Sequence, residues 1–108
     1  EIARPGISIN ALYETSVARA KSLGYAETYL GPPGYKVSFV GHGIGLDLVE
    51  QPIIGPKNHD PLQPGMTFAI EPKINFIDAF GVGIESVFTV TETGCRIISR
   101  VPKKIFIT

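Results

Sequence analysis

The chain has 108 residues, 44% of them hydrophobic and 19% charged, and its ten basic side chains balance ten acidic ones. This composition is typical of a globular protein and argues against disorder. A balanced charge gives no field that attracts nucleic acid or an anionic membrane surface, so we expect neither as a partner. The apolar stretches are too short to span a bilayer and no signal peptide is evident. The single cysteine, Cys95, suits a reducing compartment, so we expect a cytoplasmic protein.

The first predicted element is an amphipathic helix from about Ile9 to Leu23. Ser8 is a favourable N-cap, and Gly24 supplies a stop at the C-terminal end. Between them, apolar side chains recur on one side of the helix with a period near 3.6 residues. We therefore expect that side to face a core.

Short β-rich segments follow the turn at Gly31-Pro32-Pro33-Gly34. A surface loop is expected over residues 51–65, and Thr93-Gly94 predicts a hairpin turn. No repeat or linker interrupts the chain. The sequence thus predicts one α+β unit over residues 1–108, with a helix on a mostly antiparallel, twisted sheet. The predicted strands are Lys36–Val40, residues 46–50, Thr67–Glu71, Val82–Thr91, Cys95–Ser99 and Lys104–Ile107.

One histidine is surrounded by glycines in Gly41-His42-Gly43-Ile44-Gly45. The glycines remove bulk on both sides and leave room beside the imidazole for a metal ion or a substrate. The alternative is a glycine-rich turn whose histidine only caps a neighbouring group.

Two glutamates lie in β-rich segments. Glu71 ends an apolar strand before Pro72, and Glu85 lies within the run Gly83–Val90. A buried carboxylate needs a partner such as a cation. An exposed strand end for Glu71 and a structural ion pair for Glu85 remain open. Taken together, His42, Glu71 and Glu85 form a donor set that suits Mn²⁺, Fe²⁺, Co²⁺ or Zn²⁺.

The order of these segments resembles the second half of the pita-bread metallopeptidases: methionine aminopeptidase, aminopeptidase P, prolidase and their non-peptidase relative creatinase. The resemblance rests on Arg4-Pro5-Gly6, on the glycine-rich motif around His42, on Leu62–Pro72 and on Gly83-Ile84-Glu85-Ser86. It implies a curved, mostly antiparallel sheet with a packed helix, as the C-terminal half of a catalytic domain.

The same resemblance implies roles for three residues in a site with two divalent metal ions. His42 would bind metal, Glu71 would bind metal and act as the general base, and Glu85 would bridge the ions. The implied reaction is removal of an N-terminal residue, or cleavage of a dipeptide, often next to proline, by metal-activated hydroxide. The substrate would be a peptide or, for a creatinase-like C–N hydrolase, a small molecule.

Two departures from the family pattern bear on activity. The family has two metal-binding aspartates upstream, and Asp47, Asp60 and Asp78 do not match them. We therefore expect an inactive piece of a longer protein, paired with the missing N-terminal half or with another copy. Val49 stands where the peptidases usually carry a second histidine, which also permits an inactive peptide-binding module. His59, in a proline-rich loop, is expected to be exposed.

Overall fold

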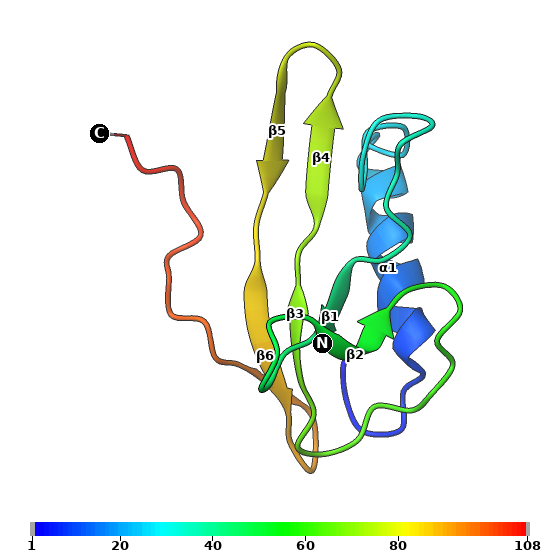
Figure 1. The fold of residues 1–108 in the computed structure, drawn as a ribbon, viewed down its shortest axis with the longest axis vertical. Helices are drawn as coiled ribbons and strands as arrows, with labels where there is room; N and C mark the ends of the chain where they lie inside the picture. Colours follow the sequence, from blue (N-terminus) through cyan, green and yellow to red (C-terminus); the bar gives the residue numbers. More distant parts are fainter. Residues whose placement is uncertain (1, 108) are drawn as a thin grey trace.

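The computed structural model describes residues 2–107. Within them the chain forms one helix followed by seven strands (Figure 1). The elements are α1 (Ile9–Ser22), β1 (Gly41–Gly43), β2 (Glu50–Ile54), β3 (Thr67–Ile70), β4 (Lys73–Phe76), β5 (Phe80–Gly83), β6 (Ser86–Val90) and β7 (Cys95–Ile97).

Five of the strands form one sheet in the order β2-β1-β3-β6-β7, and β4 pairs with β5 in a separate two-stranded ribbon. Every pairing between the named strands is antiparallel. Figure 1 shows the β4–β5 ribbon continuing the line of β3 and β6 and projecting beyond the larger sheet, alongside α1. The predicted α+β class, with a helix beside an antiparallel sheet, is confirmed.

The helix ends close to both predicted limits. Ser8 at the N-cap is extended, with φ −64° and ψ 135°. Its hydroxyl does not cap the helix but donates to Asn10 Oδ1 at 2.6 Å. At the other end Gly24 takes φ +85°, and the amides of Gly24 and Tyr25 donate back to the carbonyls of Lys21 and Ala20. This is a Schellman motif, which favours glycine because a Cβ is disfavoured at positive φ.

The core lies where α1 and the loop before β1 meet one face of the five-stranded sheet. Ile9, Val40 and Ile54 are each 0% exposed, and Phe68 stacks on Phe88 with ring centroids 5.7 Å apart. Burying a side chain of this size contributes about 1.5–3 kcal/mol, so these few residues hold the helix on the sheet. The buried cluster comprises Ile9, Leu12, Ala20, Tyr29, Leu30, Val40, Ile54, Leu62, Phe68 and Val90.

The predicted strand at Lys36–Val40 is wrong, and so is an extended segment over residues 46–49. The strand is the Gly41–Gly43 segment itself, and residues 45–49 form bends. The β-rich residues before it make irregular contacts, such as the Val37 amide donating to the Leu30 carbonyl. The loop predicted over residues 51–65 begins later, because β2 runs to Ile54.

The long strand predicted at Val82–Thr91 is divided in two. Up to Gly83 the chain pairs with β4 in the two-stranded ribbon, and from Ser86 it pairs with strands of the larger sheet. Pro72 makes the matching break between β3 and β4, and its carbonyl accepts the Ile84 amide at 3.2 Å. Since proline has no amide to donate to a ladder, the two strands leave the large sheet together.

The strand predicted at Thr67–Glu71 is confirmed as β3, and the hairpin at Thr93-Gly94 as the β6–β7 turn. Residues 104–107 form no strand. Among residues 2–107, no helix combines the length and the apolar character that crossing a bilayer requires.

Candidate metal centre

His42 is held at the centre of β1 by strands on both sides. It lies opposite Ile53 of β2 and Ala69 of β3. The flanking glycines are required by the closeness of these neighbours: a Cβ on Gly41 would overlap the Ala69 carbonyl oxygen, and one on Gly43 would overlap the Gln51 carbonyl oxygen. The motif therefore packs a histidine strand tightly and is not a flexible turn.

The imidazole of His42 is oriented by its own strand. The residue is 5% exposed, and Nδ1 lies 2.9 Å from the Gly43 carbonyl oxygen. A carbonyl only accepts, so Nδ1 donates this hydrogen bond, and in the neutral imidazole the lone pair is then on Nε2. Metal-binding histidines characteristically donate their other ring nitrogen to a carbonyl or carboxylate in this way.

Glu71 places a carboxylate oxygen beside Nε2 of His42. Its amide donates to the Val40 carbonyl at 2.8 Å, which fixes the backbone beside β1, and Oε1 lies 3.6 Å from His42 Nε2. Two donor atoms that share a tetrahedral ion lie roughly 3.3–3.6 Å apart, because each lies about 2.0–2.2 Å from the metal. The nitrogen and oxygen donors of this pair thus fit a common divalent cation.

Glu85 lies nearby but apart from this pair. It is exposed, at the break between β5 and β6 and not inside a strand as predicted. It lines a cavity of about 220 Å³ together with Glu71, Lys73, Gly83 and Ile84. In the part of the chain that the structure describes, no three His, Cys, Asp or Glu side chains converge closely enough to hold an ion alone.

Lys73 is a site residue that sequence reasoning missed. Its Nζ lies 3.6 Å from Glu71 Oε2, so Glu71 has a histidine on one oxygen and a lysine on the other. Strand alternation could have indicated it, since residues two apart share a face of a β-strand. The intervening Pro72 concealed that relation.

Two other residues weighed from the sequence lie away from the pair. Val49 is 55% exposed, in the bends between β1 and β2. His59 is exposed, as expected, and lines a different cavity.

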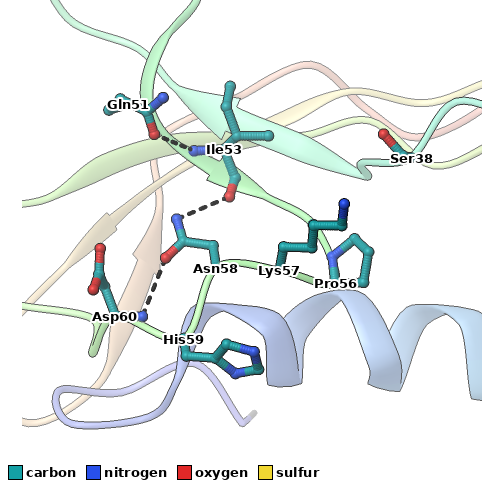
Figure 2. Close-up of a pocket in the computed structure, with 9 residues that line it drawn as sticks. Ser38, Gln51, Ile53, Pro56, Lys57, Asn58, His59 and Asp60 are labelled. Atoms are coloured by element: carbon teal, nitrogen blue, oxygen red, sulfur yellow. Dashed lines mark hydrogen bonds between the residues drawn. The ribbon is translucent and has the colours of Figure 1, made fainter.

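That second cavity, of about 620 Å³, lies between β2 and the loop before β3 (Figure 2). Figure 2 shows side chains taking both outward-facing polar groups of Ile53. The Ile53 amide donates to Gln51 Oε1 at 3.2 Å, and its carbonyl accepts Asn58 Nδ2 at 3.1 Å. The Asn58 carbonyl also accepts the Asn10 amide, which ties this loop to the start of α1.

Known proteins share both the sequence and the fold. The model of metallopeptidase family M24 matches residues 1–92. The chain is 35% identical over 107 residues to a probable dipeptidase, PepE, of Mycobacterium tuberculosis, covering 99% of this chain and 27% of that protein. It is 30% identical over 105 residues to the Xaa-Pro dipeptidase of Pyrococcus furiosus, covering 97% of this chain and 28% of the relative. The chain thus spans little more than a quarter of these curated relatives.

Solved structures agree. The X-Pro aminopeptidase of Thermotoga maritima superimposes with a TM-score of 0.88 at 32% identity, over 99% of this chain and 28% of that one. The prolidase of Pyrococcus furiosus superimposes with a TM-score of 0.83 at 30% identity, over 95% of this chain and 28% of that one. Proteins of this family are metallopeptidases with the pita-bread fold, and their chemistry depends on divalent metal ions. The chain belongs to metallopeptidase family M24.

Proposed function

We propose that this chain supplies part of the active site of a two-metal hydrolase that acts on Xaa-Pro dipeptides or on peptide N-termini. The observation that carries the proposal is the convergence of His42 Nε2 and Glu71 Oε1 at 3.6 Å. Relatives named as Xaa-Pro dipeptidases support the substrate class.

Each of the three residues has a part in this proposal. His42, with its Nδ1 proton held by the Gly43 carbonyl, offers Nε2 as a ligand. Glu71 offers a carboxylate that also takes the proton from the attacking water. Glu85, across the small cavity, would hold the second ion and share the first with Glu71 and His42. When bound, the ions supply a nucleophile from water at neutral pH and polarise the scissile carbonyl.

Three ligands cannot fill two coordination spheres. We therefore propose that further ligands come from a segment corresponding to the upstream part of the relatives. We call a protein that contains both this chain and that segment the complete polypeptide. The donor set of one nitrogen and several carboxylate oxygens suits Mn²⁺, Fe²⁺, Co²⁺ or Zn²⁺.

Metal content of the complete polypeptide tests the proposal. We expect close to two ions per chain, with loss of metal and of Xaa-Pro hydrolysis in His42→Ala. His59→Ala is the matched control, because it removes the other histidine, which lies on an exposed loop. Equal metal content in the two variants would refute the assignment of His42.

Val49 favours a second candidate, a module that binds peptides without cleaving them. Valine cannot donate a hydrogen bond to a developing oxyanion, and it stands where the resemblance implies a histidine. Calorimetry with a Xaa-Pro dipeptide separates the candidates: binding without turnover in the metal-loaded protein supports the module. Turnover that appears only in Val49→His would place the defect at this one position.

A further inference from the structure

Two nitrogen-bearing side chains of the candidate centre lie beside one carboxylate, that of Glu71. Among residues 2–107, Glu71 has the imidazole of His42 and the ammonium of Lys73 beside it, each at 3.6 Å. They use different oxygens, Oε1 toward the imidazole and Oε2 toward the ammonium. Side-chain exposure is 27% for Glu71 and 33% for Lys73, so this pair is partly screened from solvent.

The backbone around Lys73 fixes where its side chain points. The Lys73 carbonyl accepts the Leu30 amide at 2.8 Å, and Lys73 lies opposite Gly83 in the β4–β5 ribbon. A cross-strand partner shares the same face, and a Cβ on Gly83 would contact Lys73 Cβ at 3.7 Å. The lysine lines the small cavity with Glu71 and Glu85.

The charges that line this cavity suggest what the Lys73 ammonium does there. Two carboxylates face the same space, and Lys73 is the one basic residue among those that line it. The ammonium offsets their repulsion when no metal is present. If a divalent cation binds Glu71, the Lys73 ammonium lies close to it. The two positive charges repel each other, which opposes metal binding.

We propose that Lys73 is a built-in counter-ion that occupies Glu71 in the metal-free protein and lowers the affinity of the centre for divalent metal. The inference rests on the proposed function, since it concerns the affinity of the metal centre named there. It assigns to Lys73 a role separate from binding metal or substrate: a metal ion must displace the ammonium before both Glu71 oxygens are free.

Titration of the complete polypeptide with Mn²⁺ by calorimetry tests this role. We expect Lys73→Met, which keeps the apolar stem and removes the charge, to lower the Mn²⁺ dissociation constant about tenfold. Lys73→Arg keeps the charge and should bind Mn²⁺ like the unaltered protein. Lys57→Met removes a lysine from the other cavity and should also leave the affinity unchanged.

Melting curves give a second reading and show that each variant is folded. The rise in melting temperature on adding Mn²⁺ should be larger in Lys73→Met than in Lys73→Arg, because at a given Mn²⁺ concentration a lower dissociation constant stabilises the folded state more. If Lys73→Met does not fold, Lys73→Gln serves in its place.

The outcomes distinguish failure of the role proposed for Lys73 from failure of the proposed function. If Mn²⁺ binds and is lost in His42→Ala, but Lys73→Met binds it no more tightly, the counter-ion role is overturned and the two-metal hydrolase stands. If the unaltered protein binds none of Mn²⁺, Fe²⁺, Co²⁺ and Zn²⁺, the proposed function is overturned, and the inference falls with it.

Discussion

Adding one methyl group beside His42 tests why the motif contains glycine. In Gly41→Ala the new Cβ would overlap the Ala69 carbonyl oxygen and lie 3.1 Å from Ile70 Cδ1. Gly41 is not among the glycines with positive φ, so the backbone conformation itself suits alanine. The expected defect is therefore purely steric, and its source is backbone, which moves less easily than a side-chain tip.

The magnitude follows from two opposing effects. Overpacking costs about 1–3 kcal/mol and occasionally more, with backbone contacts at the upper end. Removing a glycine from the unfolded chain recovers about 0.4–1 kcal/mol. We expect a net loss of about 2 kcal/mol in the free energy of unfolding, which lowers the urea midpoint.

Urea unfolding of the complete polypeptide, followed by circular dichroism, measures this loss. Gly94→Ala is the control, since nothing lies within 4 Å of its Cβ and its φ is not positive. We expect the control to change stability by less than about 0.5 kcal/mol. If the two variants have equal midpoints, the close approach of β3 is not the reason for glycine at position 41.

Two further predictions concern the core and the alkaline limb of stability. Phe68→Ala removes a ring that is 1% exposed and should cost about 3–5 kcal/mol in urea unfolding, whereas Phe80→Ala, 61% exposed in the ribbon, should cost far less. Burial raises the pKa of the Tyr29 hydroxyl above 10.0 and that of the Cys95 thiol above 9.0. Because the folded state holds these protons more tightly, the contribution of these two groups to stability should be constant below about pH 9 and fall above it. Iodoacetamide at pH 8 should accordingly modify Cys95 more slowly in the folded than in the urea-unfolded protein; equal rates would contradict the burial effect.

Local signals predicted the elements that local interactions stabilise. The helix from Ile9 was found because Ser8 and Gly24 mark its two ends, and β3 because Thr67–Ile70 is apolar between clear breaks. The hairpin after Val90 was found because Thr93-Gly94 is a turn sequence; the Thr91 amide donates to the Gly94 carbonyl there.

Elements that depend on distant neighbours were missed. Glycine has a low intrinsic preference for strands, so Gly41–Gly43 becomes β1 only because β2 and β3 enclose it. The β4–β5 ribbon has no Asn-Gly or similar turn sequence; Asp78 adopts φ 57° in its place. The exit of both strands from the sheet at Pro72 depends on long-range pairing.

The candidate site was predictable as a set of residues and not as an arrangement. Residue type and setting singled out His42, Glu71 and Glu85, and the structure places the first two together, with Glu85 across a shared cavity from Glu71. Their assignment as metal ligands remains a prediction. Lys73 was not predicted, because Pro72 interrupts the strand and concealed that Lys73 and Glu71, two residues apart, lie side by side.

The side-chain amides at Ile53 have a consequence for aggregation. A strand at the border of a sheet normally offers free amides and carbonyls to any extended segment, which is how sheets join edge to edge. On β2, Gln51 and Asn58 already take both outward-facing groups of Ile53. A second chain that sought to extend the sheet there would first have to break two hydrogen bonds. Within residues 2–107, the two side chains therefore disfavour the addition of another strand to β2 at Ile53.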